Sequence, residues 1–155
     1  MKILLPIDGL DDSKLIMDFV LKYQWPGQVE FRVLHVVGSN DGEAQAKNAE
    51  QEAHVLVDQV GKRLKSLISS AKVTAEVRFG SATCEIVDAA IGWGAQMIVM
   101  GYRTRPNVKP FFTGSVANGV ATVAPCSVAI IRPDTSATAT GAITWEEELE
   151  EIKFS

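Results

Sequence analysis

The chain has 155 residues, of which 46% are hydrophobic and 22% charged, and its formal net charge is −4. This length predicts one domain, and the composition supports a normal hydrophobic core and argues against a disordered chain. The acidic balance argues against non-specific binding of nucleic acid, which is typical of overall basic domains. The first apolar run is too short for a signal peptide, and no stretch approaches the length of a membrane span. We therefore expect a cytoplasmic protein.

Five short apolar segments have the length and composition of buried strands. In chain order, they cover residues 2–7, 29–37, 72–79, 95–101 and 127–133. Pro6 lacks a backbone donor, and its place near the end of the first segment suits a strand terminus. Two cysteines, Cys84 and Cys126, lie far apart in the sequence without metal-type spacing, which indicates free thiols rather than a disulfide.

Between these segments, apolar residues recur at helical spacing. The first helix follows the sequence DGLDD, in which Asp11 or Asp12 is a candidate N-cap. The second helix is predicted from residue 43 to residue 70, and Ser81 is predicted to cap the third. The fourth helix, residues 115–124, contains a glycine and several β-branched residues, so we expect packing rather than intrinsic propensity to stabilise it.

Strict alternation of strands and helices predicts an α/β fold with a parallel sheet covered on both faces by right-handed crossovers. We expect a doubly wound, five-stranded sheet of flavodoxin-like layering, with strand order 3-2-1-4-5, in a domain covering residues 1–133. Residues 134–155 are expected to form a linker and an acidic C-terminal tail. Ligands of such open sheets bind beyond the carboxyl ends of the strands, where the winding reverses. If the first and fourth strands pair, the loops that begin at Asp8 and Gly101 face each other across that crevice.

Several classes of chemistry lack their motifs in this sequence. There is no GxGxxG after the first strand, no GxxxxGK[ST] and no GxSxG. His35 ends an apolar strand and His54 lies in the long helix, and neither has a partner at a fixed spacing. We interpret both as structural histidines, and no catalytic residue and no metal ligand is predicted.

The stretch GYRTRPNVKPFFTGSVANGV, residues 101–120, is the remaining candidate for a site. Glycine lets the backbone approach phosphate oxygens closely, and a GS pair at a helix start offers backbone N–H groups and a hydroxyl donor. Arg103, Arg105 and Lys109 could add charge-assisted hydrogen bonds. The alternative is that Gly101 only turns the chain and the cations are solvated, and the loop by itself does not decide between the two.

Four stretches resemble universal stress proteins of the UspA type, over about residues 2–132: ILLPIDGLDDS, LHVV, VRFGSATCEIVDAA, and AQMIVMGYRT with GSVANGVATVAPCSVAIIRP. ATP-binding members of that family use a loop of the form G-x2-G-x9-G-[ST]. Here its spacing falls on Gly101, Thr104 and Gly114–Ser115, so that threonine replaces the second glycine. A β-branched residue resists positive φ and puts atoms where a phosphate would lie. Leu10 and Gln96 are lesser departures, from serine and aspartate.

The resemblance implies a regulatory protein that binds an adenine nucleotide, ATP or AMP, with Mg²⁺ brought by the phosphates. It assigns the following residues to binding: Pro6, Ile7, Asp8 and Val36 around adenine and ribose, Met100 and Gly101 at the ribose and first phosphate, Arg103 and Thr104 in phosphate range, and Gly114, Ser115 and Val116 at the outer phosphates. No general base is evident near the loop, so any ATP hydrolysis should be slow. The alternative is a dimeric interaction or scaffold module of the same fold that binds no nucleotide.

Family members are often dimers, so the resemblance also implies a homodimer. In the tail, Trp145, Leu149 and Ile152 recur at i, i+4 and i+7, which would give a helix one apolar stripe and one acidic face. The tail is either a solvated end or a segment that docks on the basic loop of its own chain or of a protein partner. We expect neither a nucleic-acid partner nor a membrane.

Overall fold

The computed structural model describes residues 1–38, 43–102 and 114–133. Its strands are β1 (Lys2–Pro6), β2 (Glu30–Val37), β3 (Lys72–Phe79), β4 (Met97–Gly101) and β5 (Ser127–Ile131). Its helices are α1 (Leu10–Lys22), α2 (Glu43–Leu67), α3 (Ala82–Trp93) and α4 (Ser115–Val123). Strands and helices alternate along the described chain as predicted, and the element ends differ from the predicted ones by a few residues.

The sheet is parallel throughout the described strands, with the order β3-β2-β1-β4-β5, which confirms the predicted fold class and strand order. Strand β1 is central. It pairs with β2 from Lys2 opposite Glu30 to Pro6 opposite Leu34, and with β4 at Ile3 opposite Met97. The winding of the chain therefore reverses between β1 and β4, as required for a ligand site at their carboxyl ends.

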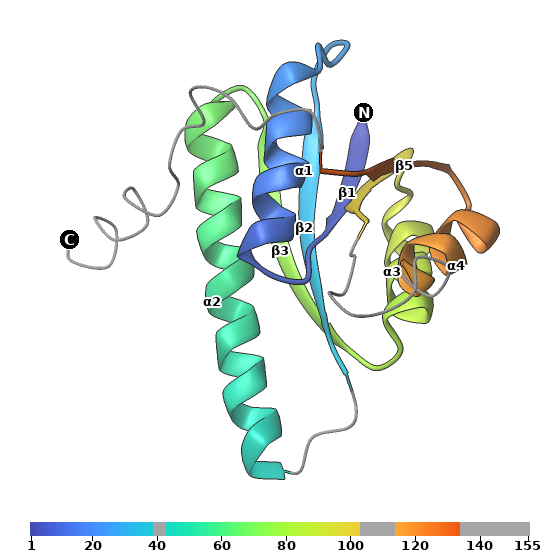
Figure 1. The fold of residues 1–155 in the computed structure, drawn as a ribbon. Coiled ribbons are helices and arrows are strands. Elements are labelled where there is room, and N and C mark those ends of the chain that lie inside the picture. Colours follow the sequence, from blue (N-terminus) through green and yellow to red (C-terminus); the bar gives the residue numbers. More distant parts are fainter. Residues whose placement is uncertain (39–42, 103–113, 134–155) are drawn as a thin grey trace.

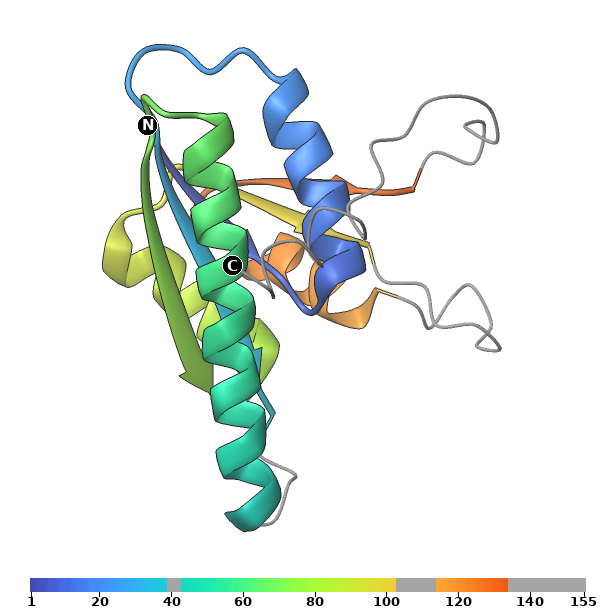
Figure 2. The same ribbon diagram turned by 90° about the vertical axis from the view of Figure 1, so that its left-hand side faces the viewer.

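Two helical layers enclose the sheet. Figure 1 shows α1 and α2 against one face and α3 and α4 against the other, and Figure 2 looks onto the layer of α1 and α2, with the sheet behind it. Along β1, Ile3 and Leu5 pack in the core beneath α1 and α2, whereas Leu4 packs in the core beneath α3 and α4. This alternation follows from the two-residue period of a strand and explains why β1 is apolar at every position between Lys2 and Asp8.

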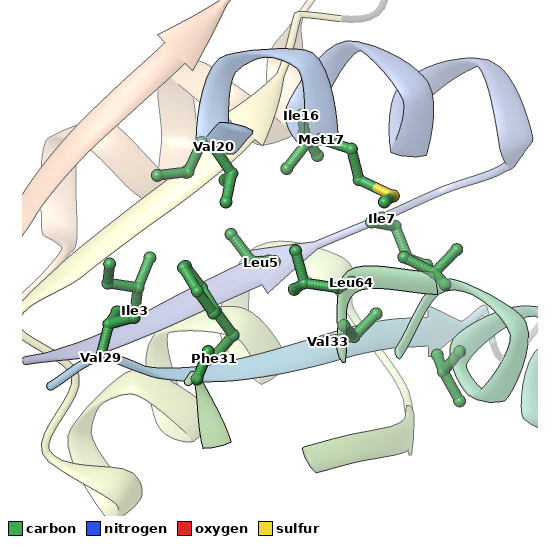
Figure 3. Close-up of a cluster of buried hydrophobic side chains, with 14 residues drawn as sticks. Ile3, Leu5, Ile7, Ile16, Met17, Val20, Val29, Phe31, Val33 and Leu64 are labelled. Carbon is green, nitrogen blue, oxygen red and sulfur yellow. The ribbon is translucent and has the colours of Figure 1, made fainter. Parts of the chain in front are cut away.

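The core beneath α1 and α2 is the larger of the two clusters. Figure 3 shows Ile16, Met17 and Val20 of α1 and Leu64 of α2 pointing onto the apolar side chains of β1 and β2. Among the described residues, Phe31 of β2 is the largest fully buried side chain. Burial of this apolar surface fixes α1 on the sheet, beside β4, and it thereby fixes where the first turn of α1 lies.

The predicted N-caps of α1 are wrong. Gly9 occupies the cap position, and Asp11 and Asp12 lie in the first turn. The carbonyl of Gly9 accepts hydrogen bonds from the backbone N–H of Ser13 at 3.0 Å and from Ser13 Oγ at 2.6 Å, so the helix begins earlier than a carboxylate cap would set it. Both carboxylates still stabilise the helix, because they lie at the positive end of its dipole. Ser81 is the N-cap of α3, as predicted.

Packing holds α4, as expected from its poor intrinsic propensity. Its Ala117 and Val120 are buried in the core beneath α3 and α4. A Cβ added to Gly119 would lie 3.1 Å from Thr83 of α3, so the glycine allows the two helices to approach closely. The position of α4, and of its N-terminus, therefore depends on tertiary contacts.

The two cysteines are free, as predicted. Cys84 is exposed, and burial raises the pKa of the Cys126 thiol. Within the described part of the chain, no helix combines the length and the apolarity that crossing a bilayer requires.

The core beneath α3 and α4 can be tested with a matched pair of substitutions. Ile98→Ala removes a fully buried side chain of β4, and we expect it to lower the free energy of unfolding by about 2–5 kcal/mol. Ile91→Ala makes the same chemical change in α3 at a side chain that is 61% exposed, and it should change stability by about 0.5 kcal/mol or less. Urea unfolding followed by circular dichroism measures both. Equal losses of unfolding free energy in the two variants would contradict the burial of Ile98 in this core.

Candidate functional site

The carboxyl ends of β1, β2 and β4 meet at one edge of the sheet. The backbone N–H of Ile7 donates to the carbonyl of Leu34 at 2.8 Å, which extends the pairing of β1 and β2 by one residue. Nδ1 of His35 lies 2.8 Å from the carbonyl oxygen of Ile7. His35 thus ties β2 to the start of the loop after β1, which agrees with its interpretation as a structural histidine.

The residues assigned to adenine and ribose lie on these strand ends. Pro6 and Ile7 are buried, and Asp8 is exposed immediately after them. Val36 is half-buried near the end of β2. The buried pair fixes the backbone at this point, and Asp8 lies exposed at the start of the loop that leads into α1.

Two more of these residues end the neighbouring strand. Met100 and Gly101 are buried at the end of β4, where they pair with Ile130 and Ile131 of β5. The next residue, Tyr102, donates its backbone N–H to the carbonyl of Ile131 at 2.8 Å. β4 is therefore held against β5 up to the point where the candidate loop begins.

The N-terminus of α4 lies beside this strand end. Gly114 is its N-cap, with φ 84° and ψ 27°, a left-handed conformation that favours glycine. Ser115 is exposed and Val116 is half-buried in the first turn, which contains no acidic residue. First-turn N–H groups have no partner within their own helix, and with the helix dipole they favour an anion. This end of α4 has the chemistry of an anion-binding site.

Some of the residues predicted for the site lie outside the described residues. These are Arg103 and Thr104, together with the rest of the basic loop and the acidic tail. We call residues 6–8, 36, 100–101 and 114–116 the β1/β4 edge. The structure brings these segments to one end of the sheet, from three strands and one helix that are distant in sequence.

Two side chains at this edge were not predicted from the sequence. Asp12 of α1 lies against Gly101, so that a Cβ built on Gly101 would be 2.5 Å from Asp12 Oδ1 and 3.0 Å from its Cγ. The ring of Tyr102 lies against Gly114, where a Cβ would be 2.8 Å from both Cδ2 and Cζ. The guanidinium of Arg132 stacks on the same ring, 4.2 Å from its centroid. The space that both glycines leave open is thus filled by side chains of the chain itself.

The described residues include no group of three or more His, Cys, Asp or Glu side chains placed to hold a metal ion. A shallow hollow of about 240 Å³ lies between α1 and α2, lined by Leu10, Gln51, Glu52, Val55, Leu56 and Gln59. Its lining is mostly apolar and none of the residues predicted for the site contributes to it. The β1/β4 edge, where strand ends and a helix N-terminus converge, is therefore the better candidate for a ligand site.

The contact between Gly101 and Asp12 has a consequence for stability. Gly101→Ala places a methyl group on the Asp12 carboxylate, and we expect a loss of about 1–2 kcal/mol in the free energy of unfolding. The loss should shrink in an Asp12→Ala background, with a coupling of about 0.5 kcal/mol or more in the double-mutant cycle. Gly92→Ala is the control, because a Cβ at this helical position meets nothing within 4 Å and should stabilise by about 0.5–1 kcal/mol. Additive effects at positions 12 and 101 would contradict the contact.

Comparison with known proteins agrees with this fold. The family model of the universal stress protein family matches residues 1–132. Among solved structures, the chain is similar to the hypothetical protein MJ0577, with 23% identity and a TM-score of 0.73 over 86% of this chain and 96% of that one. A comparison with curated proteins gives no match.

Two further structural relatives contain ligands. A universal stress protein from Archaeoglobus fulgidus in complex with dAMP is 20% identical, with a TM-score of 0.61 over 84% of this chain and 97% of that one. A universal stress protein in complex with cAMP is 13% identical, with a TM-score of 0.64 over 85% and 96%. At such identities the likeness shows the shared fold, and the family model covers nearly the whole α/β domain. The chain belongs to the universal stress protein family.

Proposed function

We propose that the chain is a regulatory protein that binds an adenine nucleotide, ATP or AMP, at the β1/β4 edge. The observation that carries this proposal is the convergence of the ends of β1, β2 and β4 with the N-terminus of α4, where no acidic residue occupies the first turn. The relatives in complex with dAMP and cAMP support it, because both ligands contain adenine.

In this proposal, the backbone of Pro6 and Ile7, the Asp8 carboxylate and the backbone of Val36 contact adenine and ribose. Met100 and Gly101 lie by the ribose and first phosphate. The N–H groups of Gly114, Ser115 and Val116 receive phosphate oxygens, because the N-terminus of α4 offers donors and a partial positive charge. Mg²⁺ would reach the site on the phosphates, since the described residues include no cluster of acidic side chains that would hold it independently.

The second candidate is an interaction module of the same fold that works as a homodimeric scaffold without nucleotide. Thr104 in place of a loop glycine favours this alternative, and so does the filling of the Gly101 and Gly114 spaces by Asp12 and Tyr102. Strand β5 lies at an edge of the sheet and could pair with a second copy. Either function is proposed for a cytoplasmic homodimer.

The helix N-terminus can be tested by adding a charge. Ser115→Glu puts a carboxylate where the proposal puts phosphate, and we expect AMP and Mg-ATP to bind at least about tenfold more weakly. Thr122→Glu is the control, because it adds the same charge at an exposed position near the other end of α4. Isothermal titration calorimetry on protein freed of bound nucleotide measures both. The wild type is expected to bind AMP with a Kd on the order of 100 µM. The absence of binding by wild type at millimolar nucleotide would favour the scaffold.

Residue 104 distinguishes a weakened site from a lost one. We expect Thr104→Gly to strengthen nucleotide binding by about threefold to tenfold, because glycine reaches positive φ and removes the side chain from the path of a phosphate. The same titrations with AMP and Mg-ATP measure the change, with Thr104→Ser as the control that keeps the hydroxyl and removes the β-branch. Unchanged affinity in Thr104→Gly would favour a loop that serves only as a scaffold.

A further inference from the structure

The glycines of the β1/β4 edge have unusual neighbours for a site that receives phosphate. Gly101 has Asp12 Oδ1 against it, 2.5 Å from where a Cβ would be. Gly114 has the ring of Tyr102 against it. A glycine at a phosphate site leaves room for the anion to approach the backbone. In this chain, a carboxylate and an aromatic ring take that room.

Asp12 is held in this place by the fold. It lies in the first turn of α1, directly before Ser13, which is buried and hydrogen-bonded to the carbonyl of Gly9. Ser13 fixes the turn, and the turn directs Asp12 to the end of β4.

Tyr102 restricts the same edge from the other side. Its backbone is fixed by the hydrogen bond to the carbonyl of Ile131, and its ring contacts both Gly114 and the guanidinium of Arg132. An anion that reached the N-cap of α4 would have to share the space beside Gly114 with this ring. A long polyphosphate needs room at both glycines, whereas a nucleoside needs room only at the strand ends.

We propose that the β1/β4 edge favours adenine ligands with few phosphates, adenosine over AMP and AMP over ATP, and that Asp12 is the residue that sets this preference. The inference rests on the proposed function, because it concerns the ligand of that same site. Its physical basis is that a phosphate approaching Gly101 meets a fixed carboxylate, which both repels it and occupies the position. Each added phosphate increases the repulsion, while the contacts to adenine and ribose stay the same.

The experiment compares three ligands across three forms of the full-length protein. Adenosine, AMP and ATP, the last with and without Mg²⁺, are titrated calorimetrically into wild type, Asp12→Asn and Asp11→Asn at about 0.15 M salt, where charges are screened beyond about 8 Å. Asp11→Asn is the matched control. It removes the same charge from the same helical turn, but from an exposed side chain that is not among the nearest neighbours of Gly101.

We expect wild type to bind ATP at least about tenfold more weakly than adenosine, with the affinity for AMP between the two. Asp12→Asn should strengthen ATP binding by about fivefold or more and change adenosine binding by less than about twofold. Asp11→Asn should change neither the ATP affinity nor the adenosine affinity by more than about twofold, because an exposed charge is screened. The ratio of the ATP and adenosine affinities is the readout, since a merely structural effect of the substitution would move both together.

Two results would overturn the inference and are distinguishable. If wild type binds ATP as tightly as adenosine, or if Asp12→Asn and Asp11→Asn shift the ratio equally, the preference is not set by Asp12 while adenine binding stands. If none of the three ligands binds either wild type or Asp12→Asn, the inference and the proposed function both fail.

Discussion

The pairing of β1 with β2 on one side and with β4 on the other is the constraint on which the rest of the structure depends. It places β1 at the centre of the sheet, buried on both faces, and it makes the chain wind in opposite directions on its two sides. Helices α1 and α4 consequently start on opposite faces of the sheet but at the same end of it (Figure 1). Two positive helix ends are thereby directed to one edge, which no local segment of the sequence could achieve.

The two helix ends are electrostatically different. The first turn of α1 contains Asp11 and Asp12, so its partial positive charge is already compensated by its own carboxylates. The first turn of α4 contains no acidic residue. Its N-cap is Gly114, which has no side chain that could accept a hydrogen bond from the first-turn N–H groups. An anion at this edge is therefore attracted by α4 and opposed by α1. The balance between this attraction and this repulsion depends on how far from Asp12 the negative charge of a ligand lies. It therefore depends on how many phosphates the ligand has.

The layout of the fold could be predicted because its signals are local. Apolar runs such as residues 2–7, helical spacing between them, and the cap at Ser81 are each encoded within a few residues, and strict alternation then leaves few topologies. The cap of α1 was predicted wrongly because the helix starts at Gly9, whose carbonyl accepts hydrogen bonds from the backbone N–H and the hydroxyl of Ser13, and both carboxylates therefore lie inside the first turn. Residue types that suit an N-cap can be recognised in the sequence, but the packing of α1 determines at which residue the helix starts.

The site could be predicted only in outline. The spacing from Gly101 to Gly114 and Ser115 is visible in the sequence, and the strand ends follow from the order of the sheet. The contact of Asp12 with Gly101 joins residues 89 positions apart in the numbering, and no periodicity or motif encodes it. A signal was present in the third acidic residue of DGLDDS, Asp12, four positions after Asp8, but its meaning depends on how α1 sits over β4. Local patterns therefore indicate where a ligand would lie and leave open which ligand is accepted.

The neighbours of Gly101 and Gly114 bear on how a glycine motif should be interpreted. Gly101 is the last residue of β4 and lacks a left-handed φ, so its lack of a side chain matters through space, and Asp12 uses that space. Position 114 requires glycine for two reasons: its φ is positive, and a Cβ would overlap the ring of Tyr102. Both residues would thus be required by internal packing even in a chain that bound nothing. Their presence in the G-x2-G-x9-G-[ST] spacing is consequently weak support for phosphate binding, and the N-terminus of α4, whose first turn carries no acidic residue, is the stronger support.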